Sequence, residues 1–526
     1  MLKGPAIFHP TTHKMNAITR RNEIISLMER KHTFSHSTAE RARLEELPER
    51  TFPLPSRAFH FSELALTQSQ HTHKIITTLD LAMQTKLEAL LRQQLDTLPP
   101  EATLSAGISD NNSGSLLAYV GNARFSYTDT RKASWVDCGS SPRSPGSALK
   151  PFAYLSAIEQ GLLTPSTLLA DTSVAFSGRA PRNFDLTYRG AVTARTALHD
   201  SLNAPAVRVL RLAGADRVLQ LMRQSGFAHL TKPAAYYGDS LILGGCEVTL
   251  LELLEGYTAL ASGGVHRSLR LTETGTETGT RVASDGACYI VGDILRYDGE
   301  FSGGLNISLK TGTSYGLRDA WACAWTKDYT VCVWAGIPDG SSWEGLVGAR
   351  AAAPIAVKIF RLLPVSAPYE RPDGVITRRV CALSGRPPTA LCPSTKMDYA
   401  LDGMSRTVPC DIHGVKGSVN MPEGFSTEGG KSTRLSIISP VPGASYFNAP
   451  NDSERKIPLK AEGSRGRVYW YIDGEYAGMS EGGASLLRDI PDGEHVVSAA
   501  DDAGRSARVT VKVFTPGRRT AGEKLF

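Results

Sequence analysis

The spacing of apolar residues changes several times along the chain, and each change marks a predicted element. Residues 15–31 (MNAITRRNEIISLMERK) place apolar side chains at near-helical spacing among charged ones, which predicts a helix within a helical, charged segment over 1–69. Residues 74–79 (KIITTL) predict a strand. Asp80 stands where a helix cap is expected, directly before a second predicted helix over 81–94.

The following part of the chain, 70–365, combines strands with a long helical stretch. Two short apolar runs within 105–121 are separated by turn-forming residues, which predicts a hairpin. Helical patterns fill about 147–265, and strand patterns return over about 287–337. Strands, then helices, then strands predict an α+β domain in which helices pack on an antiparallel sheet.

The last third of the chain changes first in composition and then in period. Residues 366–433 are rich in Pro and Gly, which predicts a connector with little regular structure. Over 434–516, short apolar runs return at roughly ten-residue spacing with turn pairs such as Asp473-Gly474 between them, which predicts a small all-β sandwich. Residues 517–526 are left as a tail.

Length, charge and hydropathy narrow the class of protein. The 526 residues are enough for two to four domains of roughly 100 to 200 residues each. The 58 Lys and Arg exceed the 52 Asp and Glu by a net charge of only +6, and they are scattered, so no nucleic-acid partner is expected. No apolar stretch approaches the roughly 20 residues that cross a bilayer, and the first residues lack the apolar core of a signal peptide. We therefore expect neither a membrane helix nor a signal peptide in this sequence.

The first candidate for chemistry is Ser147-Ala148-Leu149-Lys150, which opens a predicted helix after the loop 140–146. A serine and a lysine three residues apart share one face of a helix, one turn from each other. A lysine that burial or nearby cations keep neutral can take the hydroxyl proton, which makes the serine a nucleophile. Alone, such a pair is more often a helix cap followed by a surface lysine.

Two further motifs follow in a fixed order. Ser201-Leu202-Asn203 lies between helical segments, and Lys310-Thr311-Gly312-Thr313 lies beside a run of strands. The order SxxK, SxN, KTG is shared by class A β-lactamases and penicillin-binding proteins, so the chain resembles the penicilloyl-serine transferases. Longer stretches, such as SPGSALKPFAYLSAIEQGLL and LKTGTSYGLRDAWACAWTKDYTVCVWAGIPDG, resemble the transpeptidase domain of class A penicillin-binding proteins of the 1C type over about 70–365. The resemblance implies a β-lactamase-like fold for this domain.

The resemblance implies roles for the reacting groups. Ser147 is the expected acylated nucleophile, and Lys150 is its expected proton acceptor. Ser201 is expected to relay a proton toward the leaving group. The backbone N–H groups of Ser147 and Thr313 are expected to form the oxyanion hole, where each donor typically lowers the barrier by about 3 to 4 kcal/mol.

The resemblance also implies how the substrate is held. Asn203 is expected to bind the substrate's peptide amide, and Lys310 to supply positive charge. The hydroxyls of Thr311 and Thr313 are expected to face the terminal carboxylate. Gly312 is expected to let the substrate lie along the strand as an added strand, because a side chain there would obstruct it.

The implied function is a cell-wall D,D-transpeptidase that needs no cofactor. Its expected partners are peptidoglycan stem peptides, β-lactams and, as a further candidate, a glycosyltransferase or another cell-wall synthesis protein. Residues 1–69 resemble the last helices of a family 51 glycosyltransferase domain, and 434–516 resemble the C-terminal module of the 1C type. Because the rest of the glycosyltransferase domain and an anchor are missing from this sequence, we expect no glycosyltransferase activity. The family implies a place at the periplasmic face of the inner membrane.

Two other classes of function remain open. The same serine would serve a D,D-carboxypeptidase or a β-lactamase, although nothing in the sequence marks the extra Glu with which class A β-lactamases activate water. The chain would alternatively be a catalytically idle β-lactam-binding or scaffold protein of the cell-wall machinery.

Two cysteines lie in an expected hairpin. The runs around Cys323 and Cys332 alternate with period two on either side of Lys327-Asp328. If that pair forms the turn, the cysteines stand opposite each other with Cα atoms about 4.5 to 5.5 Å apart, within disulfide range. The alternatives are a disulfide and two free, buried thiols.

A second cysteine cluster lies in the connector. Cys381, Cys392, Cys410 and His413 offer three thiolates and an imidazole, which is a zinc-ligand set, although the first spacing is longer than in usual metal knuckles. A disulfide that tethers the connector is the favoured alternative, the more so in an oxidising periplasm. We therefore expect no metal here, with zinc as the weaker alternative.

Overall fold

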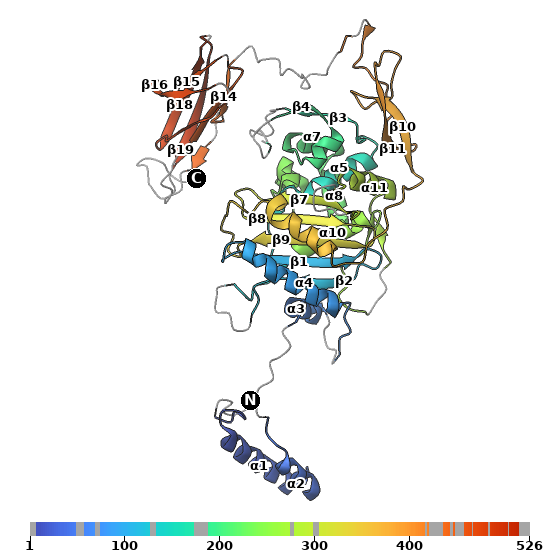
Figure 1. Cartoon of the computed structure of the whole chain (residues 1–526), viewed down its shortest axis with the longest axis vertical. Helices are drawn as coiled ribbons and strands as arrows, with labels where there is room; N and C mark the ends of the chain where they lie inside the picture. Colours follow the sequence, from blue (N-terminus) through green and yellow to red (C-terminus); the bar gives the residue numbers. More distant parts are fainter. Residues whose placement is uncertain are drawn as a thin grey trace.

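The structure of the protein, a computed structural model, is shown in Figure 1. It describes residues 7–48, 57–68, 74–126, 133–172, 183, 188–273, 278–297, 304–415, 418–419, 435–441, 445–447, 457–464, 466–481, 484–502 and 504–514. The predicted tail over 517–526 and the end of the connector over 420–433 lie outside these described residues.

The centre of the molecule is a five-stranded antiparallel sheet with the order β2-β1-β9-β8-β7. The predicted hairpin within 105–121 is confirmed as the β1–β2 pair, with a register shift between Ile108 and Ser109 that leaves Leu117 of β2 unpaired. In Figure 1 the strands follow one another down the domain, with β7 at the edge nearest the helices α5, α7 and α8. The strands are β1 (Thr103–Asp110), β2 (Leu116–Val120), β7 (Ser308–Thr313), β8 (Asp319–Trp325) and β9 (Tyr329–Gly336).

Both faces of this sheet are buried, and β8 shows how its residues divide between them. Trp321, Cys323 and Trp325 face the helical part of the domain, where they join the core around α5 (Lys150–Glu159) and α10 (Leu250–Ala261). The alanines between them face α4 (Leu81–Gln94) and α12 (Ala353–Phe360). Bulky side chains therefore fill one layer, while small ones let two helices pack closely on the other.

The long helical stretch is confirmed, with short elements between its helices. The remaining helices of the domain are α6 (Ala194–His199), α7 (Asn203–Ala213), α8 (Ala215–Gln224), α9 (Ala234–Tyr237) and α11 (Asp285–Ile294). The short elements are η1 (Leu95–Thr97), η2 (Gly146–Leu149), η3 (Gly238–Leu243), η4 (Gly348–Ala352), β3 (Leu168–Asp171), β4 (Gly190–Thr193), β5 (Val265–His266) and β6 (Thr280–Arg281).

Two local predictions before β1 had different outcomes. The helix over 81–94 is confirmed as α4, and Asp80 caps it by accepting a hydrogen bond from Met83 N at 2.9 Å. The strand over 74–79 is wrong, because the segment makes only one isolated bridge, between Thr77 and Thr272. Its apolar residues lack a neighbouring strand with which to form a ladder.

The strand expected to start near residue 287 is also wrong, because this segment is α11. The side chain of Ser284 accepts a hydrogen bond from Ala287 N, which caps the helix. Ala287, Ile290 and Ile294 are buried at helical spacing. The run of β-branched residues suggested a strand, but the Ser284 cap and the buried apolar face favour a helix.

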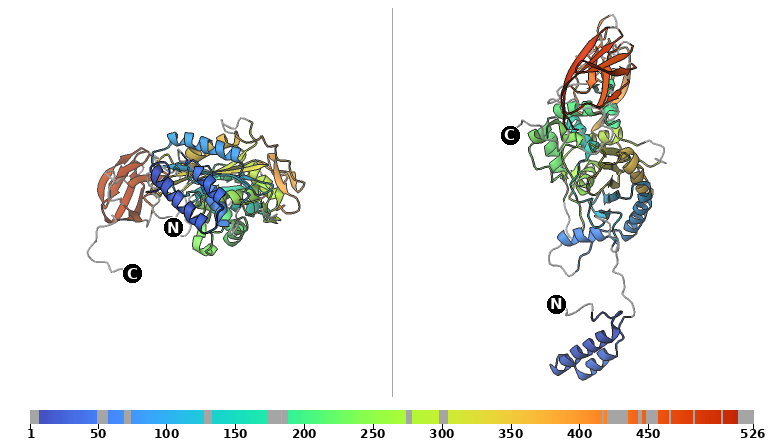
Figure 2. Two further views of the ribbon diagram at one scale, coloured as in Figure 1. Left: turned by 90° about the horizontal axis from the view of Figure 1, so that it is seen from below. Right: turned by 90° about the vertical axis from the view of Figure 1, so that its left-hand side faces the viewer.

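The N-terminal segment is helical, as predicted. It contains α1 (Lys14–Arg30), α2 (His36–Leu44) and α3 (Phe59–Gln68). Helices α1 and α2 pair with each other and lie apart from the central domain in Figure 1 and in the right-hand view of Figure 2. Helix α3 instead packs on β2, where Phe61 and Ala65 enter the central core. In the described part of the chain, no helix is both long and apolar enough to span a bilayer.

The connector is more ordered than predicted, which corrects the expectation of little regular structure. A regular antiparallel ladder joins β10 (Val375–Cys381) to β11 (Thr395–Leu401). The Pro and Gly residues that suggested an irregular segment lie mostly in the loops around these strands. Composition averaged over the segment therefore concealed two short alternating runs.

The predicted C-terminal all-β module is confirmed as two sheets that enclose one core. Their orders are β12-β14-β17 and β13-β19-β18-β15-β16. Trp470 is fully buried in this core, and its Nε1 donates to Ser480 Oγ at 3.0 Å. The strands are β12 (Ser436–Ser439), β13 (Ser445–Phe447), β14 (Ile457–Glu462), β15 (Val468–Ile472), β16 (Glu475–Ser480), β17 (Leu486–Arg488), β18 (Gly493–Asp501) and β19 (Ser506–Phe514).

Candidate active site

Ser147 lies in the single turn η2, which leads directly into α5. Ser147 is half-buried, while the residues from Ala148 to Lys150 are buried. Its hydroxyl has no hydrogen-bond partner among the described residues. The predicted placement of a serine at a helix start, with a lysine one turn later, is therefore found, and the hydroxyl is available to a substrate.

Glycine and tryptophan contacts hold this turn against the sheet. Gly146 has φ +55°, and a Cβ on it would lie 2.3 Å from Thr313 O and 2.8 Å from Thr313 N. The backbone beside Ser147 therefore abuts the end of β7, as an oxyanion hole shared between the two segments requires. Trp321 Nε1 donates to Ser144 O at 2.9 Å, which holds the preceding loop on the same sheet.

Arg143 supplies a second anchor that the sequence did not indicate. Its guanidinium lies 4.4 Å from the ring centre of Trp334, and its Nη1 is 3.7 Å from Asp319 Oδ1. The same carboxylate accepts a hydrogen bond from Trp334 Nε1 at 3.0 Å. The loop before Ser147 is therefore held to β8 and β9 by a partly buried cation, an aromatic ring and a carboxylate.

The SxN motif forms the tight connection between α6 and α7. Ser201 has φ +59°, a conformation that costs a non-glycine residue energy and is found most often where function requires it. Asn203 is the first residue of α7, and its backbone N–H donates to Asn183 Oδ1 at 2.7 Å. Asn183 Nδ2 in turn donates to both oxygens of the buried Asp171, at 3.0 and 2.8 Å. Asp171 and Asn183 thus position the motif, although no sequence pattern marked either residue.

The two motif lysines meet at Ser201. Lys150 Nζ donates to Asn203 Oδ1 at 2.6 Å, to Ser201 Oγ at 3.3 Å and to Ser201 O. Lys310 Nζ donates to Ser201 Oγ at 2.9 Å and to Thr311 O at 2.7 Å. The three motifs, which are far apart in the sequence, therefore converge on one hydroxyl. The contact between Lys150 and Asn203 Oδ1 was not anticipated from the sequence.

Burial disfavours positive charge on both lysines. Lys150 is fully buried and Lys310 is 2% exposed. Burial lowers the pKa of Lys150 well below its ordinary value, the positive charge of Lys310 lowers it further, and Asp171 opposes the shift. Burial lowers the pKa of Lys310 to about 7.

The hydrogen bonds of Lys150 determine what its amine can do for Ser147. An ammonium group has three hydrogens, and the three observed acceptors use all of them. A neutral amine gains a lone pair that can accept a proton. The lowered pKa of Lys150 therefore favours the neutral amine, which has a lone pair and lies one helical turn from Ser147.

The side chains of β7 alternate across the strand. Lys310 and Gly312 are buried on one face, while Thr311 and Thr313 are half-buried on the other. Thr313 Oγ1 accepts a hydrogen bond from Gly348 N at 3.0 Å, so its hydroxyl hydrogen is the part that can be donated to a carboxylate. A Cβ on Gly312 would lie 2.2 Å from Pro145 O. Gly312 therefore also allows the strand to pack against the turn that carries Ser147.

We expect a Gly312→Ala variant to be less stable and slower to react with penicillin. The added Cβ would overlap the carbonyl oxygen of Pro145, which is backbone and cannot rotate away. Such overpacking costs about 1 to 3 kcal/mol of unfolding free energy. Gly374→Ala is the matched control, because a Cβ at that exposed position meets nothing within 4 Å. Urea unfolding and penicillin acylation rates measure both effects, and equal stability of the two variants would contradict the packing role.

The predicted register of the cysteine hairpin is confirmed, but the disulfide is not formed. Cys323 and Cys332 are directly opposed in the β8–β9 ladder, and both are free and buried. Burial and a neighbouring thiol raise the pKa of Cys332. The free-thiol alternative therefore describes this structure, because the two side chains fill the apolar core layer with Trp321 and Trp334.

The other cysteine cluster is brought together outside this site. Cys381, Cys392, Cys410 and His413 converge beside the β10–β11 ladder, and all three thiols are free. The disulfide favoured from the sequence is therefore not formed in this structure. The four side chains make a site separate from the motif residues.

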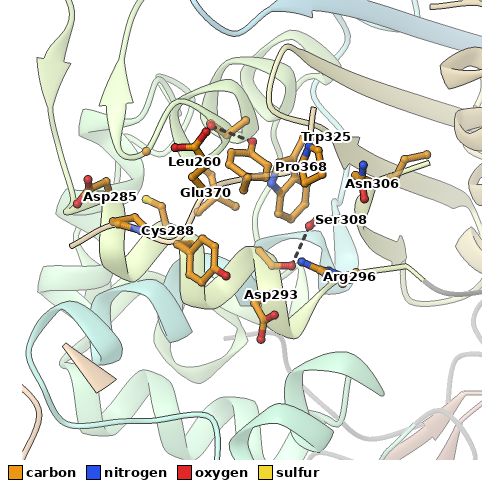
Figure 3. Close-up of a pocket in the computed structure, with 17 residues that line it drawn as sticks. Leu260, Asp285, Cys288, Asp293, Arg296, Asn306, Ser308, Trp325, Pro368 and Glu370 are labelled. Carbon is orange, nitrogen blue, oxygen red and sulfur yellow. Dashed lines mark hydrogen bonds between the residues drawn. The ribbon is translucent and has the colours of Figure 1, made fainter. Parts of the chain in front are cut away.

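An apolar cavity of about 90 Å³ also lies away from the motif residues (Figure 3). Residues of α10, α11, β7, β8 and 368–372 line it, including Cys288 and Trp325. None of the residues of the three motifs contributes to its wall. The groups suited to acyl transfer therefore lie at the junction of η2, the α6–α7 turn and β7, not in this cavity.

Models of three protein families match successive parts of the chain. The penicillin-binding protein transpeptidase domain matches residues 104–361. The penicillin-binding protein 1A C-terminal domain matches 371–415, and the penicillin-binding protein C-terminus family matches 427–513. Together they cover most of the chain.

Individual proteins and solved structures agree with these matches. Penicillin-binding protein 1C of Escherichia coli is 27% identical over 96% of this chain and 73% of its own length. Penicillin-binding protein 1A of Neisseria lactamica is 26% identical over 51% of this chain and 37% of its own length. The crystal structure of penicillin-binding protein 1A from Haemophilus influenzae has a TM-score of 0.62 at 18% identity, and covers 78% of this chain and 85% of that one. PonA1 of Mycobacterium tuberculosis has a TM-score of 0.52 at 19% identity, with coverages of 59% and 92%.

Proposed function

We propose that this chain, a 1C-like member of the class A penicillin-binding proteins, cross-links peptidoglycan stem peptides through an acyl-enzyme on Ser147. It carries a penicillin-binding transpeptidase domain of the serine acyltransferase type. The convergence of Lys150, Ser201 and Lys310 beside the Ser147 turn is the observation that carries the proposal. The proposed donor is a stem peptide that ends in D-Ala-D-Ala, and β-lactams acylate the same serine.

In the first half of the reaction, Ser147 Oγ attacks the carbonyl carbon between the two terminal D-Ala residues. Its proton passes to the neutral amine of Lys150. The N–H groups of Ser147 and Thr313 stabilise the negative oxygen that forms. The C–N bond then breaks, and the departing D-Ala amine receives a proton through Ser201, whose hydroxyl contacts both lysines.

In the second half, an amine of a neighbouring stem peptide attacks the acyl-enzyme carbonyl. Its proton returns through the same groups, and Ser147 leaves as a hydroxyl. Lys310, Thr311 and Thr313 hold the donor's terminal carboxylate before the first step, while Asn203 holds the peptide backbone. Attack by water instead of the amine would make the protein a D,D-carboxypeptidase.

Product analysis separates the candidate functions. With stem-peptide donor and an acceptor amine, the transpeptidase releases free D-Ala and forms a cross-linked product in equal amounts. A carboxypeptidase releases D-Ala without cross-linked product. If the chain binds penicillin but yields neither free D-Ala nor cross-linked product, only the scaffold alternative remains. The absence of glycosyltransferase activity, the periplasmic location and a cell-wall synthesis partner stay predictions.

We expect the acylation rate to set in at a lower pH than an ordinary lysine would allow and to fall above neutral pH. Lys150 must be neutral to accept the proton of Ser147. An ordinary lysine loses its charge at a pKa of about 10.4, and the lowered pKa of Lys150 moves the rising limb of the pH–rate profile well below that pH. Lys310 must be charged to hold the carboxylate, and its pKa of about 7 places the falling limb just above neutrality. The measurement is the second-order rate of penicillin acylation from about pH 5 to 10. A rate that rises tenfold per pH unit up to pH 10 would contradict this description.

A further inference from the structure

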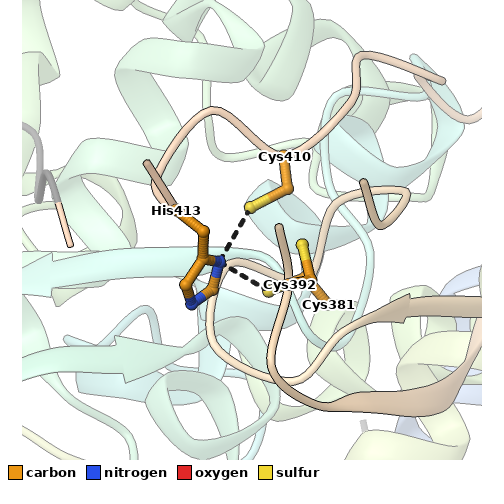
Figure 4. A group of neighbouring side chains, drawn as sticks. All are labelled: Cys381, Cys392, Cys410 and His413. Carbon is orange, nitrogen blue, oxygen red and sulfur yellow. Dashed lines mark hydrogen bonds between the residues drawn. The ribbon is translucent and has the colours of Figure 1, made fainter. Parts of the chain in front are cut away.

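The cluster of Cys381, Cys392, Cys410 and His413, called here the connector cluster, gathers residues from three parts of the connector. Cys381 ends β10, and Cys392 lies in the loop between β10 and β11. Cys410 and His413 follow β11, three residues apart (Figure 4). Cys381, Cys410 and His413 are buried, and Cys392 is partly exposed. The connector cluster therefore brings together residues from both ends and the middle of the segment 381–413.

Two sulfur–nitrogen distances within the connector cluster match the edge of a metal-centred tetrahedron. All four ligand atoms lie within 4.8 Å of one another. His413 Nδ1 is 3.6 Å from Cys381 Sγ and 3.4 Å from Cys410 Sγ. Zinc–sulfur bonds of about 2.3 Å and zinc–nitrogen bonds of about 2.0 to 2.1 Å give a sulfur–nitrogen edge of about 3.6 Å in a tetrahedron. The ligand atoms therefore surround a space of the size that zinc occupies.

Backbone N–H groups donate hydrogen bonds to two of the three sulfur atoms. Ser384 N donates to Cys381 Sγ at 3.5 Å, and Thr389 N donates to Cys392 Sγ at 3.3 Å. Hydrogen bonds of this kind orient and stabilise the ligands of bound metals. A disulfide does not require them, because its sulfur atoms carry no charge.

We propose that the connector cluster is a structural zinc site with three thiolate ligands and the imidazole Nδ1 of His413. The softness of three sulfurs and one nitrogen selects zinc over magnesium or calcium. Four protein ligands close the tetrahedron, so the ion has no open position for catalysis. A disulfide would involve only two of the sulfur atoms. It would not explain why the third thiol and the imidazole lie beside them.

The zinc site ties the connector to the transpeptidase domain. Leu168, the first residue of β3, packs against the connector cluster. Asp398 of β11 accepts a hydrogen bond from Ser166 N at 3.0 Å just before β3. Strand β3 ends at Asp171, the carboxylate that holds Asn183 and, through it, the start of α7. Zinc bound here would therefore stabilise the packing of the connector against β3.

The test is the metal content and ligand chemistry of the full chain. When purified under reducing conditions, the protein is expected to contain one zinc ion per chain, measured by inductively coupled plasma mass spectrometry. Replacement by cobalt is expected to give the intense thiolate-to-metal absorption of a tetrahedral site. Removal of zinc with a chelator is expected to lower the unfolding temperature and to speed proteolysis within 382–412, and both changes are expected to reverse when zinc is restored.

Three variants distinguish ligation from general loss of structure. Cys410→Ser is expected to lose the zinc equivalent and the cobalt absorption. Cys246→Ser, which changes a buried thiol outside the connector cluster, is expected to keep both. His413→Cys is expected to keep zinc and to shift the cobalt spectrum toward that of four sulfurs. A wild-type chain without stoichiometric zinc, or with two of the three cysteines joined when unreduced peptides are mapped, would overturn the proposal.

Discussion

A Ser147→Ala variant is expected to lose covalent labelling by a fluorescent penicillin. The label depends on a bond between the serine oxygen and the carbonyl carbon of the opened β-lactam ring, and alanine has no atom that can form it. Removal of the nucleophile from a serine enzyme costs on the order of 10⁶ in rate, so the signal falls to background. Fluorescence of the chain after denaturing electrophoresis measures the bond, because denaturation releases penicillin that is only bound.

The matched control for this change is Ser141→Ala. Ser141 lies in the same loop, and its hydroxyl donates only to Asp137 O, at 2.8 Å. This variant is expected to label like the unchanged chain. Labelling of Ser147→Ala at the level of the control would place the nucleophile elsewhere and refute the proposed acyl-enzyme.

A Lys150→Met variant is expected to be acylated about 10² to 10⁴ times more slowly. Methionine keeps much of the side-chain length but has no amine to accept the proton of Ser147. The loss corresponds to about 3 to 5 kcal/mol of activation free energy. The measurement is the second-order rate of penicillin acylation, with circular dichroism to show that the variant is folded.

Two further variants make the result specific to Lys150. Lys358→Met changes an exposed lysine of α12 whose Nζ contacts Gln94, and it is expected to react at the normal rate. Lys310→Met is expected to weaken binding of substrates that carry a carboxylate. Because the positive charge of Lys310 lowers the pKa of Lys150, this variant is also expected to shift the onset of acylation to higher pH, while acylation itself is retained. If Lys150→Met reacted normally and Lys310→Met did not react at all, Lys310 would be the base.

Much of the fold could be predicted because its signals are local. Asp80 and the apolar spacing after it predicted α4, and the turn residues near 110–114 predicted the β1–β2 hairpin. The failures have equally physical causes. The segment at 74–79 has strand-like composition but no partner strand, and β10 and β11 were concealed by the Pro and Gly of their loops. Strand formation depends on a neighbour, which a single stretch of sequence does not contain.

The candidate site divides in the same way. The three motifs identified Ser147, Lys150, Ser201, Asn203 and Lys310 because their spacing and order are specific. Nothing in the sequence connected Asp171 and Asn183 to Asn203, or Arg143 to Asp319. Those contacts join segments that are distant along the chain, and each residue type is common at surfaces and in turns.

Residue identity and order were sufficient to name the candidates: a serine as nucleophile, two lysines expected in the same site, and a cysteine–histidine set for which a disulfide was favoured over zinc. Only the tertiary structure decided the surroundings of the two lysines. An exposed lysine would be charged at neutral pH, but packing of η2, the α6–α7 turn and β7 removes water from Lys150 and Lys310 and places their amines on one hydroxyl. Desolvation and proximity are properties of the packed structure, and they lower the pKa of both lysines below its ordinary value.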